Sequence, residues 1–157
     1  MALNKGKQWE QKIKEDFSKL PGATIDRLYD TEGGKLGVRN IADAIGYCFP
    51  YHFYIEAKSC KGNTFPLTNL SQYEKLKEKV GIKGVRAGVI LWAIEKKLVL
   101  YIPVDTFTKI KAAGKKSFNL TKDLNSSDFP SIILPSSIPR VFPIVDYTPL
   151  LSLPENW

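Results

Sequence analysis

The chain is 157 residues long, carries a formal net charge of +7, and is 43% hydrophobic and 25% charged. These values are typical of a globular protein with enough residues for one core, so we expect a single domain over residues 1–157 rather than a disordered chain. No stretch approaches the roughly 20 apolar residues of a membrane helix, and the first residues lack the apolar core of a signal peptide. We therefore expect a cytoplasmic protein without membrane contacts. One histidine and two cysteines exclude histidine-pair catalysis within one chain and a disulfide framework.

The positive charge is concentrated in the first three quarters of the chain. Residues 1–122 hold 22 of the 23 basic residues and 12 acids, whereas residues 123–157 hold Arg140 alone against four acids. The first part thus has a balance of +10, which favours a polyanionic partner such as nucleic acid. The second part holds six of the ten prolines, so we expect it to wrap irregularly over the basic body instead of adding a regular layer.

The first half of the sequence predicts one helix and two strands. Asn4 is placed to cap a helix whose apolar residues recur every three or four positions and which ends before Pro21. Residues 23–29 have strand character and lead into a glycine-rich loop at 30–37. Residues 51–58 alternate strictly enough to predict a strand that places Tyr54, Glu56 and Lys58 on one face.

The second half predicts two more helices and a hairpin. A loop over 59–69 precedes an amphipathic helix that reaches from Leu70 to Val80. Residues 85–94 and 98–104 then form two core strands, and Asp105 caps a short helix that ends at Gly114. The order of helix, strands, helix, strands and helix indicates an α/β fold with one mixed sheet flanked by helices.

Two carboxylates and a lysine are expected to converge beside the strand at 51–58. Glu56 and Lys58 project from the same face, and a turn can bring Asp43, thirteen residues before Glu56, next to them. Two carboxylates with a backbone carbonyl, for which Ala57 is suitably placed, make a plausible Mg²⁺ site that phosphate oxygens complete. Such a site supports metal-assisted hydrolysis of a phosphodiester, in which Lys58 orients water or neutralises developing charge.

The alternative interpretation of Glu56 and Lys58 is a solvated ion pair. An acid followed two residues later by a lysine is common on strands and is more often structural than catalytic. The neighbouring residues make this strand apolar enough to be central, where charges are costly unless they are paired or functional. Both interpretations therefore stay open at the level of these residues.

The sequence around these residues resembles a known family of nucleases. Asp43 followed by Glu56-Ala57-Lys58 is similar to the active-site signature of restriction-endonuclease-like nucleases, the PD-(D/E)xK superfamily. The residues that follow resemble specifically the RecU-type Holliday junction resolvases, in which Glu-Ala-Lys is followed by a threonine, a Phe-Pro-Leu and an asparagine before a helix with a glutamine near its start. The matching residues here are Thr64, Phe65-Pro66-Leu67, Asn69 and Gln72.

This resemblance implies a restriction-endonuclease-like mixed β-sheet flanked by helices and a homodimer that resolves four-way DNA junctions with Mg²⁺, for which Mn²⁺ would substitute. Asp43 and Glu56 would hold the metal, Lys58 would be the catalytic lysine, and Glu10 and Gln72 would support the site. Only 22 residues separate Leu20 from Asp43, which implies a shortened form of the stalk that the family carries there. A compact member of this kind fits a bacterial or phage-encoded protein of recombination and repair.

The basic and polar residues around this site are the candidates for DNA contacts. The set comprises Lys5, Lys7, Lys12, Lys14, Lys35, Arg39, Lys61, Asn63, Thr64 and Lys75. Two alternatives remain open, namely an Mg²⁺-dependent flap, nicking or restriction-type endonuclease, and a basic DNA-binding accessory protein without catalysis. An RNA-binding protein is less favoured, because the sequence has no aromatic-plus-glycine recognition motif.

Overall fold

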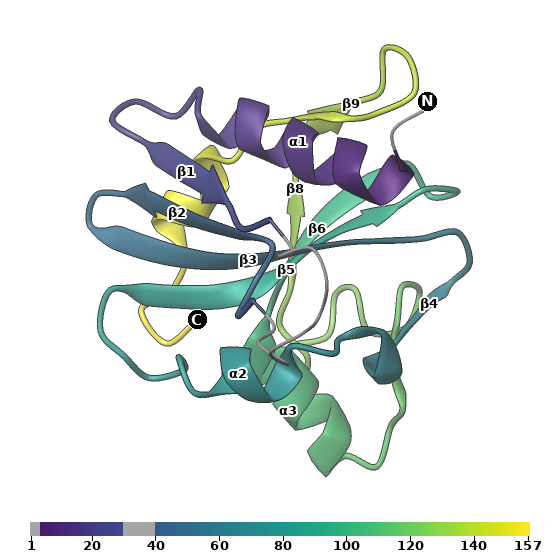
Figure 1. Ribbon diagram of the computed structural model, residues 1–157. Helices are drawn as coiled ribbons and strands as arrows, with labels where there is room; N and C mark the ends of the chain where they lie inside the picture. Colours follow the sequence, from purple (N-terminus) through teal and green to yellow (C-terminus); the bar gives the residue numbers. More distant parts are fainter. Residues whose placement is uncertain (1–3, 30–39) are drawn as a thin grey trace, which may run out of the picture.

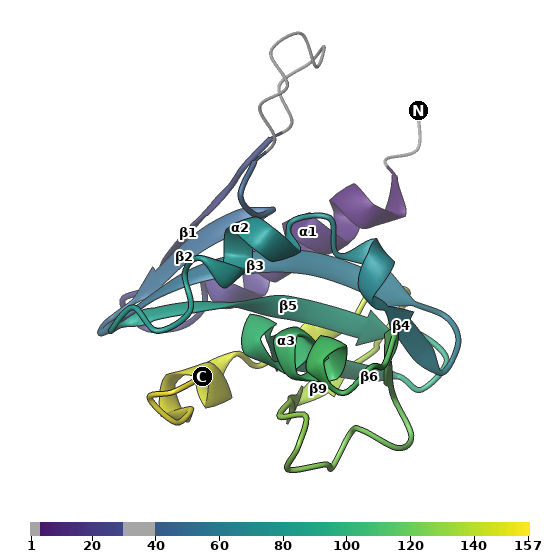
Figure 2. The same cartoon turned by 90° about the horizontal axis from the view of Figure 1, so that it is seen from below.

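The computed structural model describes residues 4–29 and 40–157, and its middle layer is a six-stranded mixed sheet in the order β1-β2-β3-β5-β6-β8. Neighbouring strands pair antiparallel except β3 and β5, which run parallel. Helix α1 covers one face, and helices α2 and α3 cover part of the other (Figure 1). Figure 2 shows the sheet from the side of α2 and α3. The predicted mixed sheet flanked by helices is confirmed.

The helices are α1 Lys5–Phe17, α2 Tyr73–Lys77 and α3 Val104–Ala112, with 3-10 turns η1 Leu67–Asn69 and η2 Thr148–Ser152. The strands of the main sheet are β1 Thr24–Arg27, β2 Ala44–Cys48, β3 Tyr51–Cys60, β5 Val85–Ala93, β6 Leu98–Pro103 and β8 Ile132–Leu134. Two smaller pairs are β4 Thr64–Pro66 with β7 Ser117–Asn119 and β9 Ser136–Ser137 with β10 Ile144–Val145.

Helix α1 begins and packs as its sequence predicts. The Asn4 side chain accepts a hydrogen bond from the backbone N–H of Gly6 at 2.8 Å, which caps the first turn. Trp9, Ile13 and Phe17 form the buried stripe of the helix. The helix lies so close to β2 that a Cβ atom at Gly46 would come within 3.0 Å of the Phe17 ring, so only glycine leaves room for this packing.

Strand β3 has the alternation that its sequence predicts and runs two residues further, to Cys60. Phe53 and Ile55 are buried on the α1 face. Glu56 and Lys58 project from the opposite face, and Glu56 is nevertheless buried by the structure around it. A central strand therefore carries the charged residues of the candidate site.

Several elements differ from the sequence prediction. Helix α3 begins at Val104, after Pro103 at the N-cap position, so Asp105 lies in its first turn and does not cap it. The short strands β4, β7, β9 and β10 were not predicted. Strand β2 was not expected, because its five residues include Gly46 at the centre. Helix α2 is shorter than predicted: after Lys77 the chain continues in turns with i to i+3 hydrogen bonds, and Val80, counted as apolar helix residue, is 40% exposed. The proline-rich segment does not only wrap, because β8 pairs with β6 at the edge of the main sheet.

The C-terminal segment is also held by a buried arginine. Arg86 on β5 is 2% exposed and donates hydrogen bonds to the backbone carbonyls of Leu153 at 3.0 Å and Pro154 at 2.9 Å. Its guanidinium lies 4.0 Å from the centre of the Tyr51 ring. Within residues 4–29 and 40–157, the fold contains no helix with the length and apolar character that crossing a bilayer requires.

Candidate active site

Asp43 lies where β2 and β3 diverge in the main sheet, a point that we call the fork. Strand β2 begins at Ala44, opposite Ile55, whereas β3 continues past this point to Cys60. The backbone of Asp43 still joins both neighbours: its N–H donates to the carbonyl of Ile55 at 3.0 Å, and its carbonyl accepts from the N–H of Leu28 at 2.8 Å. The Asp43 carboxylate then accepts the N–H of Ala57 at 2.8 Å. A side chain therefore takes the hydrogen bond that a longer β2 would have taken.

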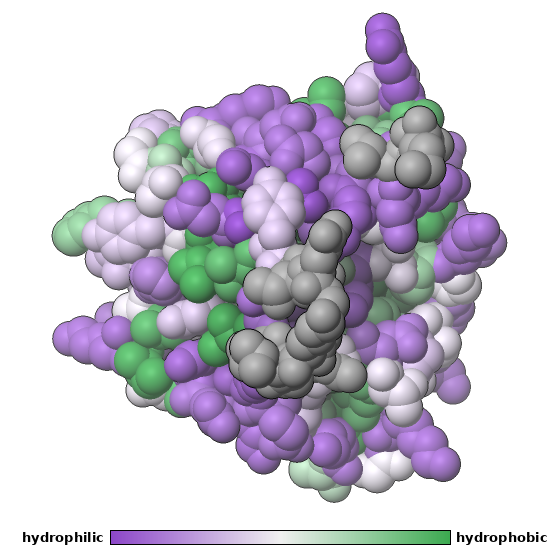
Figure 3. All heavy atoms as spheres, in the orientation of Figure 1, coloured by the Kyte–Doolittle hydropathy of each residue, from purple (hydrophilic) through white to green (hydrophobic). Residues whose placement is uncertain are grey.

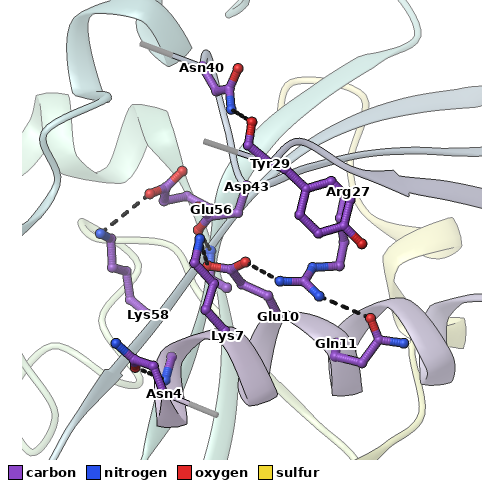
Figure 4. Close-up of polar contacts among 12 residues, drawn as sticks. Asn4, Lys7, Glu10, Gln11, Arg27, Tyr29, Asn40, Asp43, Glu56 and Lys58 are labelled. Carbon is purple, nitrogen blue, oxygen red and sulfur yellow. Dashed lines mark hydrogen bonds and ion pairs between the residues drawn. The ribbon is translucent and has the colours of Figure 1, made fainter. Parts of the chain in front are cut away.

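Glu56 lies beside Asp43 and is almost completely removed from water. Its side chain is 1% exposed, and the Lys58 ammonium lies 3.3 Å from one carboxylate oxygen, Oε1. The other oxygen, Oε2, has no hydrogen-bond partner among the described residues. Figure 4 shows the side chains of Asp43, Glu56 and Lys58 gathered at this point. The predicted convergence of two carboxylates and a lysine is thus present in the structure.

The two carboxyl groups perturb each other. Burial raises the pKa of Glu56 to about 8, the negative charge of Asp43 adds to this, and the Lys58 ammonium opposes it. Burial also raises the pKa of Asp43; the Ala57 N–H works against this, and the charge of Glu10 works with it. At neutral pH the Glu56 carboxyl therefore keeps its proton and can donate it in a hydrogen bond to the Asp43 carboxylate, and a bound cation would take the place of that proton.

Glu10 on α1 is close enough to raise the pKa of Asp43, as the predicted supporting role requires. Its carboxylate pairs with Arg27 of β1 at 2.7 Å and with Lys7 at 3.6 Å. Arg27 also donates to the Gln11 amide oxygen at 3.0 Å, so its guanidinium bridges two residues of α1 (Figure 4).

Arg27 was missed by the sequence analysis, and a signal for it was available. In a strand, Arg27 shares a face with Ile25, which is buried against α1. An arginine on the inward face of a predicted strand needs an acid partner, because an unpaired charge there is costly. In the structure this acid is Glu10 of α1, which pairs with Arg27 and also lies near Asp43.

Helix α1 is also joined directly to the lysine-bearing end of β3. The Trp9 indole N–H donates to the backbone carbonyl of Lys58 at 3.1 Å. Trp9 itself is 2% exposed, and its ring packs at a tilt against Trp92 of β5, with 5.6 Å between the ring centres. The position of Lys58 therefore depends on the packing of α1 as well as on the sheet.

The residues of the fork fit a divalent metal ion. Buried carboxylates with raised pKa values, together with the unpartnered Oε2 of Glu56, leave room for a positive charge. No group of three or more histidine, cysteine or acidic side chains in the described parts of the chain is placed to hold a metal by itself. Two carboxylates suit Mg²⁺, which keeps several waters and binds substrate phosphate. Ala57, whose N–H is used by Asp43, remains a predicted ligand through its carbonyl.

The structure does not bring every predicted residue to this point. The Gln72 side chain accepts a hydrogen bond from the Ser71 hydroxyl at 2.7 Å, and no described contact links Gln72 to the carboxylates. Asn63 contacts Asn119 and Thr121 near β4 and β7. Lys12 pairs with Glu15 and Asp16 along α1.

The other predicted DNA contacts are spread over the molecule. Lys5, Lys7 and Lys14 lie on α1, and Lys75 is exposed on α2. Lys61 is exposed after β3, and Thr64 is exposed at the start of β4. Hydrophilic side chains gather along α1 in the space-filling view (Figure 3). Lys35 and Arg39, and the shortened stalk of which they are part, lie outside the described residues. Their contact with DNA stays a prediction.

The candidate site is not in either of the two main hollows of the surface. The larger hollow, of about 620 Å³, lies at the opposite end of β3 and β5 and is lined by residues such as Val85, Val104 and Trp157. The second, of about 520 Å³, lies between α1 and the C-terminal segment. Neither hollow is lined by Asp43, Glu56 or Lys58.

Comparison with known proteins gives a likeness in fold. No model of a known protein family and no curated protein sequence matches the chain. Among solved structures, the chain is similar to Hjc, a Holliday junction resolvase from the archaeal hyperthermophile Archaeoglobus fulgidus, with a TM-score of 0.50 and 19% sequence identity. The match covers 64% of this chain and 78% of that one. The chain therefore shares its fold with this protein over the matched part.

Proposed function

We propose that this protein is a Mg²⁺-dependent endonuclease that cuts DNA and prefers four-way junctions. The observation that carries the proposal is the pair of buried, mutually perturbing carboxylates of Asp43 and Glu56 with the Lys58 ammonium 3.3 Å from Glu56. A mere structural ion pair would need one acid and one base, whereas this site holds a second, half-buried acid whose charge and hydrogen bond perturb the pKa of Glu56.

Each residue of the site has a distinct task in this reaction. Asp43 and Glu56 would hold Mg²⁺, which, when bound, would polarise a phosphodiester and lower the pKa of a water molecule. Lys58, whose side chain is 26% exposed, reaches from the carboxylates toward solvent, where it neutralises charge that develops as water attacks phosphorus and a P–O bond breaks. Glu10, which Arg27 holds in place, would contribute a further negative charge near Asp43.

Preference for four-way junctions is the finer part of the proposal. It is supported by the likeness in fold to a solved resolvase and by the similarity of residues 56–69 and Gln72 to the RecU type. Resolution needs two matched cuts in opposed strands, so we propose a homodimer with two sites related by a two-fold axis. Lys5 and Lys14 on α1 and Lys75 on α2 would hold backbone phosphates.

The test compares three DNA substrates, two site variants and one control variant. Synthetic four-way junction, flap and linear duplex are incubated with Mg²⁺ and with the wild-type chain, Asp43→Asn, Glu56→Gln or the control Glu95→Gln, an exposed carboxylate at the β5–β6 turn. We expect symmetric nicks in the junction that both site variants abolish and the control retains. Binding of the junction in Ca²⁺ should persist in all variants.

Two outcomes would contradict the proposal in different ways. Equal cutting of all three substrates would leave a nuclease of a flap, nicking or restriction type and remove the junction preference. Junction binding without any cutting by the wild-type chain, with Mg²⁺ or Mn²⁺, would leave a DNA-binding accessory protein in which Glu56 and Lys58 only pair.

A further inference from the structure

Three aromatic side chains form a row on the face of the sheet that carries Glu56 and Lys58. Tyr47 of β2 lies opposite His52 of β3, and Tyr54 follows two residues later on the same face. Their ring centres are 6.4 Å apart between Tyr47 and His52 and 5.4 Å apart between His52 and Tyr54. We call these three residues the aromatic row. The pairing of β2 with β3 explains the spacing of these rings, but it does not explain why three aromatic residues occupy the outward positions.

The aromatic row is accessible because the helices on this face lie elsewhere. Helices α2 and α3 pack against β5, and α3 also packs against β6. Tyr47 is 40% exposed, and His52 and Tyr54 are half-buried. An aromatic side chain that served only the core would be covered as Phe53 is, which lies between His52 and Tyr54 and is fully buried. The row is therefore a surface with rings available for a ligand.

The row leads directly to the candidate active site. Tyr54 and Glu56 are two residues apart on one strand and on one face, which places their Cα atoms about 7 Å apart. This separation equals about two base steps along a duplex strand. A strand whose phosphate lies at Glu56 and Lys58 therefore has its neighbouring nucleotides within reach of Tyr54 and then of His52.

Among the described residues, a single cation lies beside the aromatic row, and the nearest exposed acid of β1 lies beyond its end. The Lys79 ammonium lies 5.4 Å from the centre of the Tyr54 ring, at the end of the row. Asp26 is exposed on β1 of the same face, opposite Ile45, and lies beyond the row at the sheet edge. The rings are tilted against each other by 58° and 47°. Aromatic rings with a cation beside them suit single-stranded nucleic acid, because every base has a π-face and the cation can contact the backbone.

We propose that the aromatic row receives unpaired bases of the DNA strand next to the cut, with Tyr47 and Tyr54 as stacking surfaces and Lys79 on the backbone. That the ligand is DNA rests on the proposed function, whereas the accessibility of the three rings follows from their positions in the structure. Unstacking costs least for bases that are unpaired or only weakly paired, and such bases occur at a branch point more readily than within a continuous duplex. The row would then select branched DNA by capturing such bases.

The first test measures DNA binding without cleavage. Fluorescence anisotropy in Ca²⁺ follows a labelled single strand and a labelled four-way junction with Tyr47→Leu, Tyr54→Leu and Lys79→Gln. We expect each tyrosine variant to weaken single-strand binding about fivefold or more, since stacking contributes about 1–3 kcal/mol per base. Tyr47→Phe and Tyr54→Phe should bind as wild type because they retain the ring, which also guards against a misfolded leucine variant.

A matched control separates stacking from general apolar contact. Phe49 is 79% exposed at the turn between β2 and β3 and is not part of the row, so Phe49→Leu should leave binding unchanged. Equal losses in Phe49→Leu and Tyr47→Leu would overturn the proposal. So would a change in the sedimentation of Tyr47→Leu without a change in DNA binding, because the row would then be covered by a second copy of the chain.

The second test locates the bases. Iodouracil is placed at single positions around the branch point of the junction, irradiated, and the adducts are mapped by mass spectrometry. Adducts at Tyr47 or Tyr54 from positions next to the branch support the row, and adducts only elsewhere overturn it. If the wild-type chain cuts DNA but the substitutions in the aromatic row leave DNA binding unchanged, this inference is wrong and the proposed function stands. If those substitutions weaken DNA binding but the wild-type chain does not cut DNA, the proposed nuclease activity is wrong and this inference stands.

Discussion

At the scale of single residues, the pairing of Glu10 and Arg27 links α1 to the candidate active site. Both side chains are nearly covered, with 12% and 9% exposure. Loss of one charge from such a pair leaves the other without its partner in a poorly hydrated place. The pair therefore has more influence on stability and on the site than an ion pair at the surface.

Replacement of Arg27 by methionine tests this influence. We expect the free energy of unfolding, measured by urea titration, to fall by about 2 kcal/mol, and DNA cleavage to fall at least about tenfold, since Glu10 loses the group that positions it. Lys109→Met is the control, because Lys109 pairs with Asp105 at 3.5 Å with both side chains exposed and should cost no more than about 0.5 kcal/mol. Similar losses in the two variants would show that Arg27 has no special part.

The raised pKa of Glu56 predicts how stability depends on pH. Because the folded chain binds the proton more tightly than the unfolded chain, this group's contribution is fully present below about pH 4.5 and is lost as pH rises toward about 8. We expect the thermal midpoint of the metal-free protein to fall over this range relative to Glu56→Gln. Mn²⁺ should raise the midpoint of the wild type more at the upper end of the range than at the lower end, because it replaces the proton. A pH dependence identical in the two proteins would contradict the prediction.

At the scale of secondary structure elements, strands β5 and β6 are packed too closely to tolerate a side chain at Gly88. A Cβ atom there would lie 2.6 Å from the Tyr101 ring and 2.7 Å from the carbonyl oxygen of Ile102. Tyr101 is itself fully buried, so its ring has little space into which to move. The backbone of β6 would have to shift.

Gly88→Ala should therefore lower the free energy of unfolding by about 1–3 kcal/mol, the usual cost of overpacking. Urea unfolding measures the change. Gly62→Ala is the matched control, because a Cβ atom at Gly62 meets no other atom within 4 Å; it should be neutral within about 0.5 kcal/mol. Activity per folded molecule should be unchanged in both variants, since neither residue contacts the carboxylates.

The elements also show what the sequence could and could not predict. Helix α1 and strand β3 have strong periodicity, and both were predicted with the correct buried residues. Strand β2 and edge strand β8 are short and owe their conformation to the strands beside them, which no local pattern records. The convergence of Asp43 with Glu56 followed from alternation and a family signature, whereas the role of Arg27 depends on the packing of β1 against α1.

The limits at Gln72 have a similar physical origin. Its place at the start of a helix was predicted, but the orientation of its side chain toward Ser71 depends on the turn between η1 and α2. From the sequence, the strand tyrosines are interpreted as core residues and not as surfaces for base stacking, because large aromatic side chains are mostly buried. Only the positions of α2 and α3 over β5 show which tyrosines stay accessible.

At the scale of the whole molecule, the separation of charge predicts how DNA binding depends on salt. The basic body with its net +10 would release counterions on binding, so the affinity should fall steeply as the logarithm of the salt concentration rises. Lys61→Gln and Lys75→Gln should each reduce the magnitude of this slope by about 1, as expected for a phosphate contact.

Arg140→Gln provides the control for this measurement. Arg140 is exposed and lies in the acidic C-terminal segment, so its loss should leave the slope unchanged. Anisotropy titrations of junction DNA at several salt concentrations give the slopes. Equal effects of all three substitutions would show that net charge alone, and not its distribution, decides binding.

The buried Arg86 has a consequence for the order of events during synthesis. Its hydrogen-bond acceptors are carbonyl groups 67 and 68 residues later in the chain. At about 5–20 residues per second, a ribosome needs on the order of 3 to 14 s to add them. For that time the guanidinium on β5 has neither acceptor, so this side of the sheet cannot close. The native core is therefore completed only after nearly all of the polypeptide has been made.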